Sequence, residues 1–241
     1  MKIGPTYPEE QKKIKIKKCV LAIYPARDVI LTAARDKCDL IVTYSLPDVW
    51  SFNQITDELY QKMKVLLENR IYLYAIPKEW IFVKSGFTEV ISELLDLEVI
   101  DVFQNGTAPP HQAIIGRICQ IKSPSLALRD MLTKIKEKLN AAQLQYSGDL
   151  NSSIQKILLT FEHPITIPLL KSAKRLKIDT IICANYTFEL EKVAEELDLN
   201  LINVTLNIIN LGLLKLTQAL RLEHLDIDFV FINLPQSSKI F

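Results

Sequence analysis

One phrase of the sequence occurs twice, and this repeat constrains the fold more than any other feature. Apolar runs that begin at Lys18 (KCVLAI) and at Lys156 (KILLTF) are each followed by a proline and then by a helical pattern. Two segments of equal length, residues 33–39 and 173–179, then end in an aspartate before another apolar run. Short apolar runs bounded by turn residues are typical of strands buried on both faces. The repeat therefore predicts two lobes of similar topology.

Each repeat has the length of a right-handed βαβ unit, so the predicted fold class is α/β, with two lobes of similar βαβ topology. We place the lobes at residues 1–122 and 123–241. The expected strands are 14–24, 40–43, 71–76, 113–121, 156–161, 200–204 and 228–234, with one more after Asp179. The expected helices are 28–35, 54–67, 87–97, 125–139 with Ser125 as its cap, 186–197 and 212–222.

The aspartates that close the two matched segments, Asp39 and Asp179, have two possible roles. Aspartate is common in the turn between a helix and the next strand, and we favour this role. The other possibility is catalysis by a carboxylate at a functional site.

The charge balance limits the possible partners. Lys and Arg number 29 and Asp and Glu 28, so the excess positive charge that nonspecific nucleic-acid binding requires is missing. No run of about 18 apolar residues and no secretory pattern occurs, so we expect a cytoplasmic protein without a membrane span. The four cysteines are far apart in the sequence, which predicts buried thiols and not a zinc site or a disulfide framework.

The common catalytic motifs are missing from the sequence. It contains no GxGxxG, GxxxxGK, HExxH or GxSxG pattern, so dinucleotide binding, P-loop phosphoryl transfer, zincin proteolysis and serine hydrolysis lack their usual geometry. Tyr44, Trp50 and Trp80 could stack on a base in a metal-free pocket, although such aromatic residues are more often core or subunit contacts.

Several joints between the predicted elements carry a family resemblance. They are the strand that begins with Asp39-Leu-Ile-Val-Thr, the segment 71–97 with its turn and Gly86, the Gly116-Arg117-Ile118 phrase, and the segment 146–149 that opens the second lobe. Together these joints resemble the GTP cyclohydrolase type 2-like family, also named for the Ngg-one-interacting factor three. The resemblance runs from about Lys18 to the final strand.

The resemblance implies a site for two metal ions between the lobes, built from paired histidines, a His-x-x-x-Asp turn and a late His-x-x-x-Glu. In this chain the matching positions carry other residues: Tyr44, Ser45, Pro77, Ile81, Leu206 and Asn210. A register shifted by one residue would place Thr205 and Ile209 at the late pair instead. Leucine, isoleucine and proline side chains have no lone pair for a cation. We therefore expect a degenerate site, with no metal cofactor, lined by these six residues.

The three histidines, His111, His163 and His224, match none of the family's ligand positions. The main hypothesis is a non-catalytic binding or scaffold protein, and the resemblance implies a homo-oligomer in the form of a hexameric ring. The alternative is a hydrolase of a nucleotide-like substrate that uses one weakly bound cation. Its candidate residues are Glu79, Glu162, Asn185, Asn207 and Asn210. A DNA-associated regulator is disfavoured by the neutral charge balance.

Overall fold

The computed structural model describes residues 3–44, 55–81, 83–84, 86–104, 114–122, 125–139, 144–161, 164–204 and 207–234, without the side chains of Lys78, Glu79 and Asn207. The chain forms two compact units. Unit 1 comprises Met1–Pro77 and Ile209–Phe241, and unit 2 comprises Lys78–Ile208. Across the described residues, no helix is long and apolar enough to cross a bilayer.

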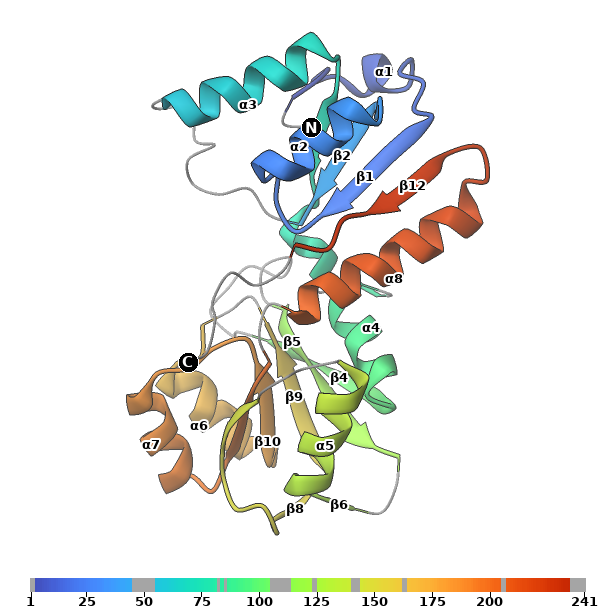
Figure 1. Cartoon of the computed structure of the whole chain (residues 1–241). Helices are drawn as coiled ribbons and strands as arrows, with labels where there is room; N and C mark the ends of the chain where they lie inside the picture. The colour runs from blue at the N-terminus through green and yellow to red at the C-terminus, as the bar shows by residue number, and fades with distance from the viewer. Residues whose placement is uncertain are drawn as a thin grey trace. The chain divides into compact units, whose positions relative to one another are not determined.

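Unit 1 contains a four-stranded parallel sheet with the strand order β12-β1-β2-β3. Helices α2 and α3 pack on one face, around a core that includes Val20, Ile30 and Ile41, and α8 packs on the other face against Leu21 and Phe229 (Figure 1). Its elements are α1 (Pro8–Gln11), β1 (Lys18–Ala22), α2 (Arg27–Arg35), β2 (Leu40–Thr43), α3 (Asp57–Glu68), β3 (Tyr72–Ala75), α8 (Asn207–Glu223, which begins in unit 2) and β12 (Asp228–Phe231).

Unit 2 contains a six-stranded mixed sheet with the order β4-β5-β9-β10-β11-β7, and a short ladder of β6 with β8. Its helical elements are η2 (Lys78–Ile81), α4 (Phe87–Leu94), α5 (Leu128–Lys138), α6 (Ile167–Arg175) and α7 (Phe188–Glu196). Its strands are β4 (Leu97–Gln104), β5 (Ile114–Ile121), β6 (Leu126–Ala127), β7 (Gln145–Ser147), β8 (Ser153–Ile154), β9 (Lys156–Thr160), β10 (Thr180–Cys183) and β11 (Asn200–Asn203).

The two units differ from the division at residues 122 and 123 that the sequence favoured. Strand β5 pairs with β9, so a boundary between them would cut a continuous sheet. At the other end of the chain, β12 returns to pair with β1. Sheet pairing between distant segments therefore sets the division, and the sequence pattern does not show it.

The repeat predicted from the sequence extends over five elements in each unit. The order β1-α2-β2-α3-β3 in unit 1 corresponds to β9-α6-β10-α7-β11 in unit 2, and the strands within each set are parallel. Helices α2 and α6 are both nine residues long and begin 140 positions apart. This confirms the α/β fold with two lobes of similar topology.

The two aspartates of the repeat make the same contact in both units. Asp39 Oδ2 accepts hydrogen bonds from the backbone N–H groups of Lys17 and Lys18, at 2.7 and 3.0 Å. Asp179 Oδ2 accepts from Gln155 and Lys156, both at 2.8 Å. Each carboxylate therefore ties the start of its own strand to the start of the preceding one, which supports the structural role over the catalytic one.

We expect Asp179→Ala and Asp39→Ala each to lower the free energy of unfolding by about 2 kcal/mol, because two backbone donors lose a charged acceptor. Asp179→Asn should cost less, since the amide keeps one oxygen. Urea denaturation measures both effects. Asp36→Ala, which removes an exposed ion pair with Arg35, is the matched control and should change stability by less than about 0.5 kcal/mol. Equal stability of Asp179→Ala and the wild type would refute the role of the carboxylate.

Helices α2, α3, α6 and α7 end without glycine. Lys37, Arg70, Lys177 and Asp198 have φ between 50° and 57°, just beyond the ends of α2, α3, α6 and α7. At each of these positions, two backbone N–H groups return to carbonyls of the last helical turn, as in a Schellman motif. The motif recurs at equivalent places in both repeats, so local backbone hydrogen bonding compensates for the low glycine content.

Two sequence predictions about unit 2 need correction. The helix expected at 87–97 ends at Leu94, and Leu97 begins β4, a strand that we did not predict, because Asp96 reverses the chain with φ of 52°. Ser125 does not cap α5: its N-cap is Ala127, and Leu126–Ala127 pairs with Ser153–Ile154. The remaining expected helices and strands are present, with ends shifted by a few residues.

Candidate functional site

The carboxyl ends of the parallel strands in unit 1 meet at one edge of the sheet, where open α/β sheets bind ligands. Tyr44 directly follows β2, and its N–H donates to the Ala22 carbonyl at 3.2 Å. Pro77 lies two residues beyond the end of β3 and is exposed. Because β2 pairs directly with β3, the structure places these two predicted residues at neighbouring strand ends. Ser45 lies outside the described residues.

The late candidate pair falls at the start of α8. Asn210 is 8% exposed, and its Nδ2 donates to the Leu234 carbonyl, beyond the end of β12, at 3.3 Å. Its Oδ1 is buried and has no hydrogen-bond partner among the described residues. Ile209, from the alternative register, is buried, whereas Leu206 and Thr205 lie outside the described residues.

The chain after β3 forms a turn that continues into unit 2, where apolar side chains pack around it. Ile81 is 2% exposed, and its carbonyl accepts a hydrogen bond from the Thr88 hydroxyl at 2.7 Å. Trp80 packs against Phe87 with ring centroids 5.8 Å apart, and Phe87 packs edge-on against Phe161 at 5.4 Å. Trp80 is therefore part of an intramolecular aromatic cluster, which is the role favoured over base stacking. Trp50 lies outside the described residues.

Gly86 allows this turn to close. A Cβ at this position would lie 2.0 Å from the Trp80 carbonyl oxygen and 2.8 Å from that of Val83. The residue is also the N-cap of α4, so the turn and the first turn of the helix share one tightly packed backbone. The glycine that carried part of the family resemblance thus has a steric reason to be there.

Unit 2 contains a buried ion pair that we did not predict from the sequence. Arg117 Nε, on β5, lies 3.0 Å from Glu89 Oε1, on α4, and the two side chains are 5% and 21% exposed. Gly116 precedes the arginine within the strand, where a Cβ would lie 2.6 Å from the Leu159 carbonyl oxygen of β9. The Gly-Arg phrase is therefore part of strand β5, within the strand predicted at 113–121. A charged residue inside an apolar strand was the only available signal, and it did not indicate the partner.

Two of the other chemically relevant side chains lie within the part of the chain that the structure describes. Asn185 is exposed beyond β10, and His224 is exposed with its ring 6.3 Å from that of Phe229. The Glu79 and Asn207 side chains, Glu162, His111 and His163 lie outside the described part. Within the described part, no group of three or more His, Cys, Asp or Glu residues lies close enough together to hold a metal ion.

The cysteines are free and buried, as predicted. Burial raises the pKa of Cys19, Cys119 and Cys183 to about 12. A thiol with such a pKa stays protonated at neutral pH and is a poor nucleophile or metal ligand. Burial likewise raises the pKa of Tyr186, beyond the end of β10, to about 12.

These features define an α/β protein of two units built on a repeated strand-helix-strand-helix-strand motif, with polar and apolar side chains at the carboxyl edge of the unit 1 sheet. The chain belongs to the Duf34/NIF3 (NGG1p interacting factor 3) family, whose model matches residues 9–237. This confirms the resemblance inferred from the joints between elements.

Two relatives carry the name "GTP cyclohydrolase 1 type 2 homolog". The protein from Clostridium perfringens is 27% identical over 242 residues, which cover 99% of this chain and 90% of that protein. The protein from Methanocaldococcus jannaschii is 31% identical over 84 residues, which cover 35% of this chain and 34% of that protein.

Solved structures share the fold at low identity. Reduced HcgD from Methanocaldococcus jannaschii is 23% identical with a TM-score of 0.72, and the match covers 90% of this chain and 83% of that one. Staphylococcus aureus protein SA1388 is 14% identical with a TM-score of 0.75, covering 95% and 88%. At these identities the similarity supports the architecture alone.

Proposed function

We propose that this protein is a non-catalytic, oligomeric binding or scaffold member of the Duf34/NIF3 family, in which the positions matching the family's metal ligands form a degenerate site. The observation that supports this most directly is the turn after β3. Ile81, which matches a carboxylate position, is 2% exposed next to the contact between Trp80 and Phe87. A buried aliphatic side chain stabilises the turn through the hydrophobic effect and offers nothing to a cation.

The donor set at the candidate positions does not fit a site for two cations. Pro77 and Ile81 have no side-chain lone pair, and the same holds for Leu206 by its chemistry. Asn210 donates through its nitrogen to Leu234, which leaves one amide oxygen. One phenol, one hydroxyl and one amide oxygen are too few for two hard or borderline cations, which take four or more ligands each.

We expect protein loaded with excess Zn²⁺, Mn²⁺ or Fe²⁺ and then dialysed to retain far less than one equivalent of metal per chain, because the donors are missing. Elemental analysis measures the retained metal. Tyr44→Phe and Asn210→Ala are matched controls, since any residual metal held at this edge should decrease in them. Two tightly held equivalents per chain would overturn the proposal.

The assembly and location are part of the same proposal. The family resemblance favours a homo-oligomer in the form of a hexameric ring, which light scattering on the same sample would report as six times the chain mass of 27.6 kDa. A monomer at micromolar concentration would count against the scaffold role. The free, buried cysteines are compatible with a reducing compartment, so we propose a cytoplasmic location.

A hydrolase of a nucleotide-like substrate is the alternative, suggested by the name of the two relatives. One observation favours it: the buried Asn210 Oδ1 lacks a partner among the described residues and could accept from a water molecule or ligate a cation. In that case GTP turnover should depend on divalent metal and decrease in Asn210→Ala and Glu79→Ala. Lack of turnover by metal-loaded wild-type protein would exclude this function for GTP.

A further inference from the structure

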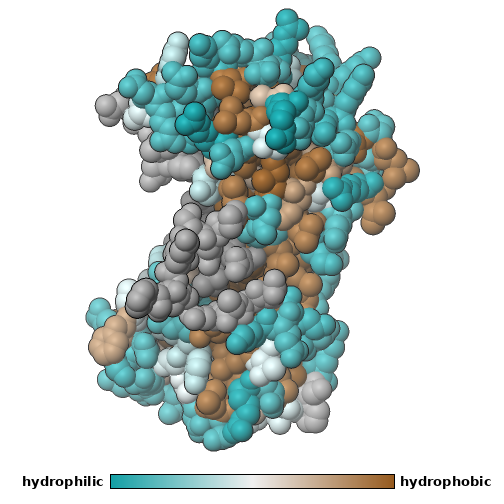
Figure 2. Space-filling view, in the orientation of Figure 1, coloured by the Kyte–Doolittle hydropathy of each residue, from teal (hydrophilic) through white to brown (hydrophobic). Residues whose placement is uncertain are grey.

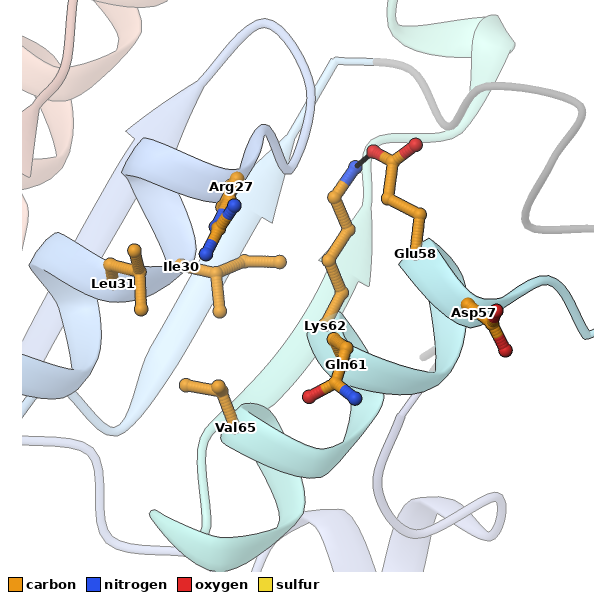
Figure 3. Close-up of a pocket in the computed structure, with 8 residues that line it drawn as sticks. All are labelled: Arg27, Ile30, Leu31, Asp57, Glu58, Gln61, Lys62 and Val65. Atoms are coloured by element: carbon orange, nitrogen blue, oxygen red, sulfur yellow. Dashed lines mark ion pairs between the residues drawn. The ribbon is translucent and has the colours of Figure 1, made fainter.

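A groove of about 420 Å³ lies between α2 and α3 of unit 1 (Figure 3). Its lining consists of Arg27, Ile30, Leu31, Asp57, Glu58, Gln61, Lys62 and Val65. Ile30 and Val65 lie on facing helices, and Leu31 is 45% exposed at the rim. On the surface over α2 and α3, apolar residues appear between hydrophilic ones (Figure 2). Of the six candidate positions, none of the four that the structure describes (Tyr44, Pro77, Ile81 and Asn210) lines this groove, so we treat it as a feature separate from the proposed degenerate site.

The second repeat carries apolar side chains at two corresponding positions, although a hollow of about 700 Å³ also lies beside α6, where Ile167 is one of the lining residues. Counted from the starts of the nine-residue helices α2 and α6, Arg27 corresponds to Ile167. Counted from the ends of α3 and α7, Lys62 corresponds to Leu190, which packs against the core of unit 2. The same motif thus carries hydrocarbon at two positions in one repeat and long cationic side chains in the other. Packing of the two helices does not require cationic side chains at these positions, because the repeat in unit 2 has apolar ones there.

The charges in the groove are unequally satisfied. Lys62 Nζ lies 2.6 Å from Glu58 Oε1, and the lysine side chain is only 11% exposed. The hydrogen bond from Lys62 is the main cause that lowers the pKa of Glu58, and the positive charge of Arg27 makes a smaller contribution. Asp57 points away from α2 in Figure 3. Arg27 has no hydrogen-bond or ion-pair partner among the described residues, so its guanidinium is available to a ligand.

We propose that this groove binds a small amphipathic oxyanion, an apolar chain that ends in a carboxylate or a phosphate. The guanidinium of Arg27 presents paired donors to either group, and Leu31 and Val65 contact the chain above the buried Ile30. The volume lies within the range of small-molecule sites. A docked protein partner would need about 800 Å² of surface on each side, more than a groove lined by eight residues offers.

The test is a titration of isotope-labelled full-length protein with octanoate, followed by NMR shifts of the α2 and α3 amides. We expect saturable binding that weakens about tenfold or more in Arg27→Ile, because a charge-assisted contact is lost. Arg27→Ile should keep its thermal stability, since Ile167 occupies the equivalent place in unit 2. Leu31→Glu, an exposed change that adds a negative charge at the rim, should also abolish binding.

The controls test separately the contribution of the ligand's anionic group and the contribution of Arg27. Arg35→Ile removes an exposed arginine of the same helix that is paired with Asp36 and lies outside the groove, and it should bind octanoate like the wild type. Octanol should bind at least tenfold more weakly than octanoate. Octyl phosphate in place of octanoate shows which oxyanion is preferred. Equal binding of octanol and octanoate, unchanged binding by Arg27→Ile, or no saturable binding of either anion would overturn the proposal.

Discussion

Glu89→Leu is expected to lower the free energy of unfolding by about 3 kcal/mol, the typical cost of removing one member of a buried ion pair. Arg117 Nε lies 3.0 Å from the carboxylate of Glu89, and the arginine side chain is 5% exposed. Without the carboxylate, the guanidinium stays in a strand between two neighbours of a six-stranded sheet, where water can hardly solvate it. Urea or thermal denaturation measures the loss.

The double variant Glu89→Leu with Arg117→Met is the informative companion. It removes both charges and keeps apolar volume, so it should regain much of the stability lost in Glu89→Leu. The control is Glu195→Ala, which removes an exposed pair with Lys192 and should cost less than about 0.5 kcal/mol. If Glu89→Leu lowered the free energy of unfolding no more than Glu195→Ala does, the pair of Glu89 with Arg117 would not contribute more to stability than an exposed pair.

Gly86→Ala is the second substitution with a large expected effect, a loss of about 3 kcal/mol. The added Cβ would lie 2.0 Å from a backbone carbonyl oxygen of Trp80, and backbone cannot move away as a flexible side chain can. Because the same residue is the N-cap of α4, relief of the clash would displace the helix that carries Phe87 and Glu89. Denaturation reports the stability, and tryptophan fluorescence reports the surroundings of Trp80.

Glu93→Ala on the exposed side of α4 is the control for this substitution. It removes a charge from the same helix without touching the turn, so the change should stay within about 0.5 kcal/mol. Wild-type stability of Gly86→Ala would show that the turn can open without cost. Tight packing of the turn would then not explain why position 81 carries an aliphatic side chain.

Local patterns predicted much of this fold. The apolar runs that became β1 and β9 are continuous because both faces of each strand are covered, and the matched aspartates kept the same hydrogen bonds in both units. The family resemblance also depended on local phrases at the joints, and the family model confirms it.

Strand β4 escaped prediction for a physical reason. Its sequence, LEVIDVFQ, is mostly exposed along its middle and contains a bulge near Ile100, so it shows neither a continuous apolar run nor strict alternation. It is a strand because β5 offers it a hydrogen-bonding edge, and such an edge is a property of the folded sheet. The same limit applies to the candidate site. The sequence named six positions, and the structure places Tyr44 and Pro77 at neighbouring strand ends, with Asn210 bonded to the residue that follows β12 by three positions.

The sequence by itself determined the α/β class, the internal repeat and the family, because each depends on residue types and short spacings. The tertiary structure alone decided the return of β12 to β1, the partner of Arg117 and the groove beside Arg27. These features join segments that are distant in the chain or depend on how two helices pack. Their energies arise from burial and from contacts between side chains, which no local pattern specifies.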